Sequence, residues 1–356
     1  MIWIITGSDK GGGTQEVAKR VFHLLNVNLS KKLKLIFIKG ASMHSSRKLT
    51  NVDYLGGSGV LSATPRLYKK VLQEKPSQII SFNQEASLLL LPLCKLLKIR
   101  LISRCMNTPS MRMADKHLGY KSRILTFLYV KFSHCFDKVI SQCKCMKKDL
   151  INNNSRLKNK IKVIYNPVPK TNKSVNLNPF SNQGSINLLF VGRLIAQKNV
   201  EFLIEIVSSY NLKNKFKVYI DIYGEGNLKT ELINYSESLN ASNYINFKGY
   251  CSNDKIPYSS YEALLLTSYY EGFPNVLLEA LSNNTKVLAQ DIKCGPSEII
   301  LHQENGWLVK SSNISDWHLG INWLKNNKNC QEKILIPDYL SDQSIINNYK
   351  TLLNAK

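Results

Sequence analysis

The sequence lacks any long hydrophobic run. Across its 356 residues, no stretch reaches the ~18 to 20 uninterrupted apolar residues that a transmembrane helix needs. Residues 1–7 read as a short strand that enters a glycine loop, whereas a signal peptide has a basic start and a long apolar middle. We therefore expect a cytoplasmic protein.

Ligand sets for a metal ion are also missing. The 8 cysteines include one close pair, Cys143 and Cys145, and the sequence has neither a CxxC repeat nor a histidine cluster with zinc spacing. An exposed Asp-x-Asp loop is absent too, because Asp221 lies within a strand pattern. The sequence therefore predicts no metal and no bound cofactor.

Acidic residues are scarce in the first half of the chain. Residues 1–165 contain 30 Lys and Arg against 8 Asp and Glu, a net charge of +22, whereas residues 166–356 contain 18 against 17, a net charge of +1. A general bias toward lysine would have raised both halves. The first half is therefore expected to have an anionic partner, for which nucleic acid and an anionic membrane are both physically reasonable.

Basic and apolar residues are interleaved between residues 116 and 148. The basic ones are Lys116, Lys121, Arg123, Lys131, Lys138, Lys144, Lys147 and Lys148, and the apolar ones include Tyr120, Phe127, Leu128, Tyr129, Phe132 and Phe136. A basic helix with an apolar face is typical of a membrane surface, although a core helix with a solvated basic face gives the same pattern. Because no helix-turn-helix, zinc-finger or RNP signature occurs, we expect an anionic membrane as the partner and no nucleic acid.

Strand and helix patterns alternate in both halves, which indicates parallel sheets. Residues 2–6 read as a first strand, and a glycine turn with Gly12 and Gly13 then leads into a helical pattern. Such a turn lets the backbone approach a ligand closely, although it matches neither GxGxxG nor a Walker A loop. Arg104 and Asn107 follow another predicted strand and are candidates for a ligand-binding cleft of this half, because ligands of such sheets bind at the carboxyl ends of strands.

A Pro-, Asn- and Ser-rich stretch without periodicity divides the chain. The sequence predicts an N-terminal Rossmann-like domain at residues 1–165, a linker at 166–185, a C-terminal Rossmann-like domain at 186–340 and a terminal helix within 341–356.

The most informative stretch is EGFPNVLLEAL at residues 271–281. Glu271 is expected in a strand-to-helix turn and Glu279 inside the following helix, with Pro274 suited to the first helical turn. At the N-terminus of this helix, a phosphate could bind to the backbone amides of Phe273, Asn275 and Val276. Two carboxylates beside a phosphate site suit a nucleotide sugar. The alternative is an ordinary helix whose acidic first turn complements the helix dipole.

This Glu-x7-Glu run resembles the signature of family 4 of the retaining glycosyltransferases, which have the GT-B fold. Three more motifs resemble that family in order and spacing: FVGRL with KN at residues 190–199, YGEG at 223–226 and NGWLV at 305–309. The resemblance implies an α/β protein with two Rossmann-like β/α/β domains that face each other across a cleft. The first would bind the acceptor, the second the nucleotide sugar, and the terminal helix would return toward the first.

The resemblance also implies roles for individual residues. Arg193 and Lys198 would form a clamp on the donor diphosphate, since both side chains suit phosphate. With Glu271, which would hold the sugar hydroxyls, they are the catalytic candidates. Glu279 would accept hydrogen bonds from the ribose. The other donor-side candidates are Gly12, Gly13, Gly224, Gly226, Tyr250, Gly272, Phe273, Asn275 and Val276. Many family members have a histidine near Arg104, so the catalytic partner in the first domain is not identified.

The activity implied by the resemblance is the retaining, metal-independent transfer of a hexose-type sugar. The donor would be UDP-linked, and the acceptor a lipid-linked glycan or a polysaccharide, as in the synthesis of bacterial lipopolysaccharide or capsule. The protein would be peripheral on the inner face of the plasma membrane. Two other classes stay open: a nucleic-acid-binding module that uses the basic half, and a nucleotide-sugar epimerase on the same fold. A dehydrogenase is disfavoured by the missing GxGxxG.

Overall fold

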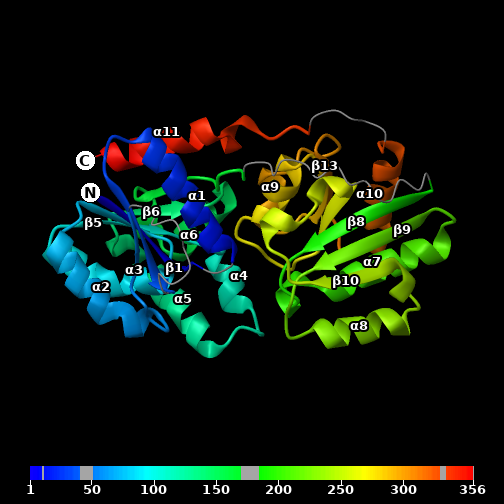
Figure 1. The fold of residues 1–356 in the computed structure, drawn as a ribbon, viewed down its shortest axis with the longest axis horizontal. Helices are drawn as coiled ribbons and strands as arrows, with labels where there is room; N and C mark the ends of the chain where they lie inside the picture. Colours follow the sequence, from blue (N-terminus) through cyan, green and yellow to red (C-terminus); the bar gives the residue numbers. More distant parts are fainter. Residues whose placement is uncertain (10–11, 41–50, 170–183, 329–333, 356) are drawn as a thin grey trace. The chain divides into compact units, whose positions relative to one another are not determined.

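The computed structural model describes residues 1–9, 12–40, 51–169, 184–328 and 334–355. The chain forms two compact units, Met1–Pro167 with Tyr339–Lys356, and Val168–Asp338 (Figure 1). Most of the predicted linker at 166–185 lies outside the described residues. Among the described helices, none combines the length and the hydropathy that crossing a bilayer requires.

The first unit is built on a parallel sheet with the strand order β3-β2-β1-β4-β5-β6-β7. Its strands are β1 Ile2–Ser8, β2 Leu33–Lys39, β3 Val52–Tyr54, β4 Gln78–Ser81, β5 Arg100–Arg104, β6 Lys138–Ser141 and β7 Ile161–Val163. Its helices are α1 Gly13–Asn28, α2 Val60–Glu74, α3 Gln84–Leu96, α4 Pro109–Ala114, α5 Tyr120–Phe132, α6 Lys144–Asn153 and α11 Asp342–Asn354. The strand order reverses between β1 and β4.

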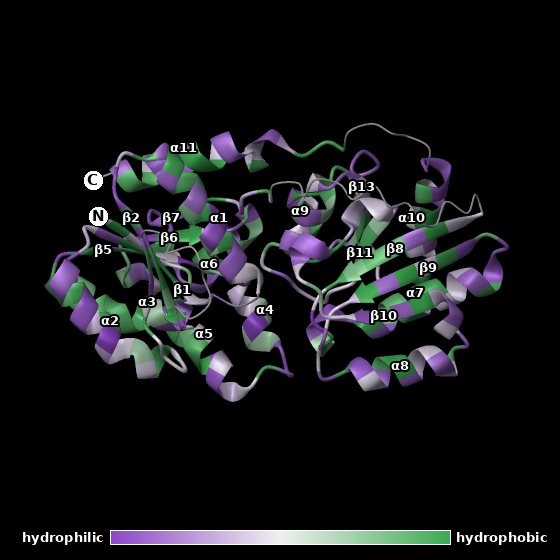
Figure 2. Ribbon diagram, in the orientation of Figure 1, coloured by the Kyte–Doolittle hydropathy of each residue, from purple (hydrophilic) through white to green (hydrophobic). Residues whose placement is uncertain are grey.

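The hydropathy of the first unit explains these elements. Residues Ile2 to Ile5 of β1 are completely buried, which fits a central strand covered on both faces. In Figure 2 the strands are mainly apolar, and the helices that cover them have both apolar and polar residues. On α1 the buried residues include Val17, Val21 and Phe22, at helical spacing. They belong to the same hydrophobic core as residues of the sheet.

Four charged side chains connect β2, β3 and α2. This charge cluster consists of Lys34, Asp53, Lys70 and Glu74, whose four ion pairs measure between 2.7 and 3.2 Å. Burial alone would raise the pKa of Asp53 and of Glu74, but the two lysine ammonium groups outweigh it and lower both pKa values. The cluster therefore fixes the sheet edge to its neighbouring helix.

The last helix, α11, completes the first unit. It packs against α1, and its side chains Ile345, Tyr349 and Leu353 belong to the core of that unit. The two chain segments that enter and leave the second unit are also held together here, since the rings of Tyr165 and Tyr339 lie 5.0 Å apart.

The second unit has a parallel sheet with the order β10-β9-β8-β11-β12-β13. Its strands are β8 Ser185–Val191, β9 Lys217–Tyr223, β10 Ile245–Gly249, β11 Ala263–Leu266, β12 Lys286–Gln290 and β13 Gly306–Val309. Its helices are α7 Val200–Lys213, α8 Lys229–Ser238, α9 Asn275–Ser282 and α10 Ile314–Asn326. Here the order reverses between β8 and β11. Two parallel Rossmann-like units confirm the predicted fold class.

Candidate donor site

The predicted donor residues gather where the second sheet reverses its strand order. The loop after β8 contains Arg193 and Lys198, and the loop after β11 contains Glu271. Because β8 and β11 are neighbours in a parallel sheet, both loops leave the sheet at its carboxyl edge. In open α/β sheets a ligand binds at this reversal, since the loops diverge there and leave room.

A short ion pair joins the two loops. Lys198 donates from Nζ to Glu271 Oε1 at 2.5 Å, and their side chains are 14% and 11% exposed. Ser268 donates its hydroxyl to the same carboxylate oxygen at 2.8 Å. The structure thus brings together two of the three predicted catalytic residues, and each lies close enough to the surface to exchange its partner for a ligand.

Backbone and amide hydrogen bonds fix the two loops around this pair. Thr267 donates from Oγ1 to the carbonyls of Lys198 and Asn199, at 3.1 and 2.9 Å. Gln197 donates from Nε2 to the Tyr270 carbonyl at 2.8 Å, and the Tyr269 amide donates to the Gln197 carbonyl at 3.0 Å. Sequence reasoning missed Thr267 and Gln197, because a hydroxyl or amide that binds a distant loop has no local pattern.

Arg193, the third catalytic candidate, is exposed. Its carbonyl accepts a hydrogen bond from the Ile195 amide at 3.0 Å, which shapes a tight turn after β8. Among the residues that the structure describes, no partner is found for its guanidinium, which is therefore available to an anionic ligand at the same sheet edge.

The glycines of the YGEG motif pack the loop after β9 against the loop after β8. A Cβ at Gly224 would lie 1.8 Å from the Gly192 carbonyl oxygen, and a Cβ at Gly226 would lie 2.1 Å from the Leu194 carbonyl oxygen. Both positions therefore exclude any side chain. Backbone packing explains these two glycines, and their predicted contact with a nucleotide base stays a prediction.

Helix α9 begins at Asn275, four residues after Glu271. The Leu277 amide donates to the Pro274 carbonyl at 3.1 Å, and the amides of Asn275 and Val276 precede it in the first turn, where a helix carries its partial positive charge. The loop after β12 supports this turn, since Gly295 has a φ of 106° and a Cβ there would lie 2.6 Å from Pro274 Cδ. Gly272 and Phe273 are buried in the same turn. A helix N-terminus thus lies beside the ion pair, as the sequence predicted.

Glu279 is buried inside α9, with 5% of its surface exposed. Its Oε2 accepts from Asn253 Nδ2 at 2.9 Å and from the Tyr258 hydroxyl at 3.2 Å, both in the segment that follows β10. Sequence reasoning missed these two donors. The carboxylate therefore shapes the loop near Tyr250, which is 71% exposed, and its contact with a ribose stays a prediction.

The NGWLV motif has a structural role at the opposite side of the sheet. Asn305 is fully buried, accepts from the Leu301 amide at 2.8 Å and donates to the carbonyls of Ile299 and Leu335 at 3.2 and 2.9 Å. A Cβ at Gly306 would lie 2.2 Å from the Val287 carbonyl oxygen, because β12 and β13 approach closely there. The three hydrogen bonds of the Asn305 side chain in the described part of the chain are all to backbone groups, so the motif stabilises the edge strand β13.

The first unit has its own reversal, between β1 and β4. Gly12 ends the loop after β1, and Gly13 is the first residue of α1. Gly12 has a φ of 105°, in the region that favours glycine, and its carbonyl accepts from the Gln15 amide at 3.1 Å at the start of α1. A Cβ at Gly12 would lie 2.6 Å from Gln15 Oε1. Both glycines are exposed, which leaves this helix start accessible, and their ligand contacts stay predictions.

Arg104 requires a correction. We expected it to face an acceptor, but it is completely buried. Its guanidinium donates to Tyr349 Oη at 2.9 Å, to the Ile164 carbonyl at 2.9 Å and to Asn166 Oδ1 at 2.6 Å. Arg104 therefore binds α11 to the carboxyl end of the first sheet. Asn107, three residues later, is half-buried and remains a candidate for the acceptor side.

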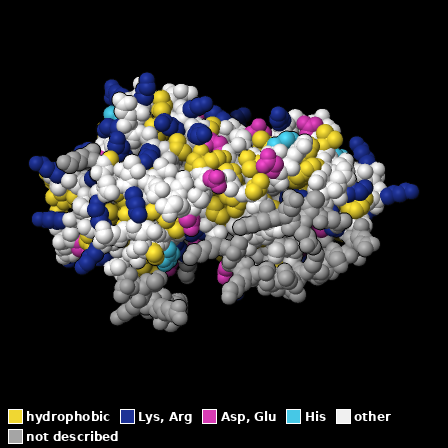
Figure 3. Space-filling model, turned by 90° about the horizontal axis from the view of Figure 1, so that it is seen from above, with side chains coloured by type: hydrophobic (Ala, Val, Ile, Leu, Met, Phe, Trp, Pro, Cys, Tyr) yellow, Lys and Arg dark blue, Asp and Glu magenta, His cyan; other side chains and the backbone are white. Residues whose placement is uncertain are grey.

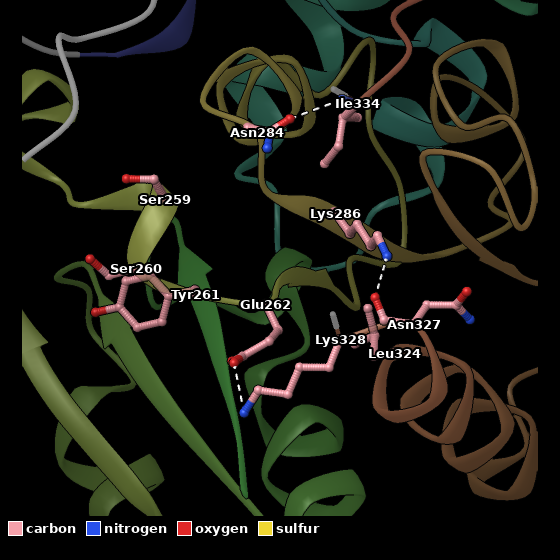
Figure 4. Close-up of a pocket in the computed structure, with 10 residues that line it drawn as sticks. All are labelled: Ser259, Ser260, Tyr261, Glu262, Asn284, Lys286, Leu324, Asn327, Lys328 and Ile334. Carbon is pink, nitrogen blue, oxygen red and sulfur yellow. Dashed lines mark hydrogen bonds and ion pairs between the residues drawn. The ribbon is translucent and has the colours of Figure 1, made fainter. Parts of the chain in front are cut away.

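A pocket of about 170 Å³ lies at the other end of the second sheet, where β11 and β12 begin (Figure 4). Its lysine side chains are bonded within the protein: Lys328 pairs with Glu262 at 3.1 Å, and Lys286 donates to the Asn327 carbonyl at 3.0 Å. Since the amino ends of the strands are opposite to the predicted donor residues, this pocket is separate from the candidate site.

No group of His, Cys, Asp and Glu within the described ranges is arranged to hold a metal ion. Positive charge at the candidate site comes instead from the side chains of Arg193 and Lys198 and from the N-terminus of α9. Metal independence itself stays a prediction.

Comparison with known protein families finds a match in the second unit. Residues 178–335, nearly all of the second unit, match the family described as glycosyl transferases group 1. The matched region contains the motifs at 190–199, 223–226, 271–281 and 305–309. The resemblance to glycosyltransferases of the GT-B type is thereby confirmed.

Two curated relatives illustrate the likeness. A poly(ribitol-phosphate) alpha-N-acetylglucosaminyltransferase of Staphylococcus aureus is 30% identical over 46% of this chain and 34% of its own length. An N-acetylgalactosamine-N,N'-diacetylbacillosaminyl-diphospho-undecaprenol 4-alpha-N-acetylgalactosaminyltransferase of Campylobacter jejuni is 29% identical over 63% of this chain and 60% of its own length. The match with each thus spans less than two thirds of the relative.

Solved structures share the fold over the whole chain. A lipopolysaccharide outer core galactosyltransferase, WaaB in its apo form, has a TM-score of 0.71 at 20% identity, with 99% of both chains covered. Anabaena Alr3699/HepE in complex with UDP-glucose has a TM-score of 0.76 at 15% identity, again with 99% of both chains covered. At these identities the likeness establishes the two-unit fold.

Proposed function

We propose, on the premise that residues 178–335 match the family of group 1 glycosyl transferases, that the protein transfers a sugar from a nucleotide-sugar donor to a glycan acceptor. The observation that carries the proposal is the Lys198–Glu271 pair at the strand reversal, beside exposed Arg193 and the N-terminus of α9. Positive groups and a carboxylate at one edge match the two ends of such a donor.

The donor diphosphate would bind to Arg193, Lys198 and the first turn of α9. Because these groups carry positive charge before the reaction begins, they stabilise the negative charge that develops on the leaving diphosphate without rearranging. Glu271 would exchange part of its bond with Lys198 for the sugar hydroxyls. This division of roles accounts for a carboxylate that is paired yet still 11% exposed.

We propose a UDP-linked, hexose-type donor and a retaining mechanism without a metal ion. The relative whose solved structure contains UDP-glucose supports the choice of nucleotide, and the lysine and arginine charges supply what a metal would otherwise contribute. In this mechanism the acceptor attacks the face that the diphosphate leaves, and the departing phosphate takes the acceptor's proton.

The acceptor in this proposal is a lipid-linked glycan or a polysaccharide at the inner face of the plasma membrane. Support comes from the printed names of the relatives, one of which acts on a poly(ribitol phosphate) and another on a diphospho-undecaprenol-linked sugar. The net charge of +22 on residues 1–165 adds to it, since anionic lipids attract basic domains. Lys and Arg side chains outnumber acidic ones over the first unit in the view of Figure 3.

A thermal-shift panel of UDP-, GDP- and ADP-linked sugars, with and without magnesium, tests the donor proposal. A ligand that binds the folded state raises the melting temperature by mass action. We expect a selective shift with one UDP-sugar that magnesium does not alter and that Arg193→Met weakens. The product's anomeric configuration, measured by NMR, then tests retention. A panel without any shift, or a shift that requires magnesium, would contradict the proposal.

A further inference from the structure

Helix α5 exposes apolar side chains on the face that should be polar. The large side chains Tyr120, Phe127 and Ile124 are 68%, 54% and 52% exposed, and Phe132 and Leu128 are 41% and 36% exposed. In a surface helix of a globular protein the outward face carries polar or charged residues. On α5 the exposed face is mainly aromatic and aliphatic, so folding of the first unit leaves these apolar side chains in contact with water.

These five residues form one stripe, which we call the α5 apolar face: Tyr120, Ile124, Phe127, Leu128 and Phe132. Their spacing of three, four and eight residues places them on the same side of a helix with 3.6 residues per turn. The opposite side contains Thr126, Tyr129 and Val130, which are buried against the unit. Helix α5 thus has an apolar stripe on each side. At 100° per residue, Arg123 lies beside the exposed stripe, and Lys121 and Lys131 lie within it.

The charged residues of α5 are all basic. Lys121, Arg123 and Lys131 lie on the helix, and the Lys131 ammonium group lies 5.9 Å from the centre of the Phe132 ring. The nearest acidic side chains before and after the helix are bonded within the unit. Asp115 accepts from the His117 amide at 2.9 Å, and Asp137 accepts from the Leu101 amide at 2.8 Å. Both carboxylates keep their charge, but five Lys and Arg outnumber these two between residues 115 and 138, so the surroundings of the apolar face are net positive.

We propose that the α5 apolar face docks onto an anionic lipid bilayer, with its aromatic rings at the boundary between headgroups and acyl chains. A helix whose outer side combines Phe, Leu and Tyr with basic residues matches the composition of helices that lie in this interface, because long lysine side chains can extend toward the headgroups while the apolar side chains enter the boundary. The positive charges match anionic headgroups, and the length of α5, 13 residues, excludes a transmembrane course. An acidic protein partner would match the charges but would not need five exposed apolar side chains along one helix.

The position of α5 connects docking to the reaction. Helices α4 and α5 follow the carboxyl end of β5, and the Arg112 guanidinium on α4 donates to the Ser122 hydroxyl on α5 at 2.6 Å. Asn107 lies between β5 and α4 along the chain. The face would therefore bring the acceptor edge of the first unit toward a membrane that holds a lipid-linked acceptor. This role rests on the proposed function, whereas lipid binding itself does not.

Vesicle flotation tests the proposal with the full chain. We expect binding to vesicles of equal parts phosphatidylglycerol and phosphatidylcholine, weak binding to phosphatidylcholine alone, and a decrease with salt that leaves a residual apolar component. The double substitution Ile124→Ser with Phe127→Ser should lower the partition coefficient by about tenfold or more, because two half-exposed apolar side chains no longer enter the interface. Leu212→Ser, at an 80% exposed leucine of the second unit, is the matched control and should bind as the unsubstituted protein does.

Two readouts separate the possible outcomes. The double variant should keep its melting temperature and the shift that a UDP-sugar produces, so a loss of lipid binding cannot come from unfolding or from a failed donor site. If the double variant floats as well as the control, or if the unsubstituted protein does not bind anionic vesicles, the proposal is wrong. Sedimentation equilibrium addresses the other occupant: a dimer that the double substitution dissociates, together with absent vesicle binding, would make the face a self-association surface instead.

Discussion

Replacing Lys198 by methionine tests whether the Lys198–Glu271 pair serves the donor, the fold or both. The substitution keeps the aliphatic length of the side chain and removes the ammonium group. Glu271 then retains the Ser268 hydroxyl but loses its cation, in a turn where its side chain is 11% exposed. The cycle is completed by Glu271→Gln alone and by the two substitutions together, and in the double variant the unbalanced charge is absent again.

The expected magnitudes follow from burial. Removing one partner of a buried ion pair costs about 3 to 5 kcal/mol, and the low end of about 3 kcal/mol applies here because the carboxylate keeps a hydrogen bond and some contact with water. In the double variant no charge is left without its partner, so we expect about 2 kcal/mol to be regained. Donor binding should be lost in Lys198→Met and in the double variant, because both lack the cation that would bind the diphosphate.

Urea unfolding followed by tryptophan fluorescence measures this cycle. Three of the 4 tryptophans, Trp307, Trp317 and Trp323, lie in the second unit, so their emission reports mainly on the unit that contains the pair. The matched control is Lys229→Met, which removes a 2.8 Å pair with a Glu225 side chain that is 48% exposed. An exposed pair such as this one, between the loop before α8 and the first residue of α8, contributes about 0.2 to 1 kcal/mol, so this variant should change little.

The outcomes distinguish the two roles of the pair. If the double variant is destabilised by the sum of the two single variants, Lys198 and Glu271 do not interact in solution and the site geometry is wrong. If the single variants bind UDP-sugars as well as the unsubstituted protein, the pair is structural and the donor site lies elsewhere.

Three further predictions concern the parts that support the site. Gly224→Ala should destabilise the second unit by about 3 kcal/mol or more, seen as a lower urea midpoint, because its Cβ would lie 1.8 Å from a carbonyl oxygen; an unchanged midpoint would contradict the close approach. Arg104→Met should leave buried acceptors on α11 and near β7 unpaired, at about 1 to 3 kcal/mol each, and should make α11 sensitive to limited proteolysis. Stability of the first unit should decrease as the pH falls through the lowered pKa values of the charge cluster, since carboxylates with depressed pKa values stabilise only while ionised; acid titration of Lys70→Met, which should show a smaller decrease, checks this.

The sequence predicted those parts of the fold that depend on local patterns. Long apolar strands such as β1 and β8 and the helix after Pro274 were recognised, because hydrophobic periodicity and turn residues specify them within a few neighbours. The short strands β3, β6, β7 and β13 were missed. Each has three or four residues, and its partner strand is distant in the sequence, so pairing rather than propensity makes it a strand.

The candidate site shows the same division. Lys198 and Glu271 were predicted from motifs, since charged residues after apolar strands can be recognised without geometry. The fixing bonds of Thr267 and Gln197 could not be predicted, because they depend on which loops meet. Arg104 shows the opposite error: an arginine after a strand looks accessible in a sequence, and its burial depends on a helix that begins 238 positions later, at Asp342.

The division of the chain between its units affects the order in which the protein can be completed during synthesis. Residues of the second unit, Val168–Asp338, are contiguous, so this unit can form as soon as it leaves the ribosome. The first unit emerges earlier but lacks α11, which supplies Ile345 and Tyr349 to its core and a partner to the buried Arg104. Until residues 342–354 are made, that guanidinium and the apolar groove under α11 face water. The half that is synthesised first is therefore the half that is finished last.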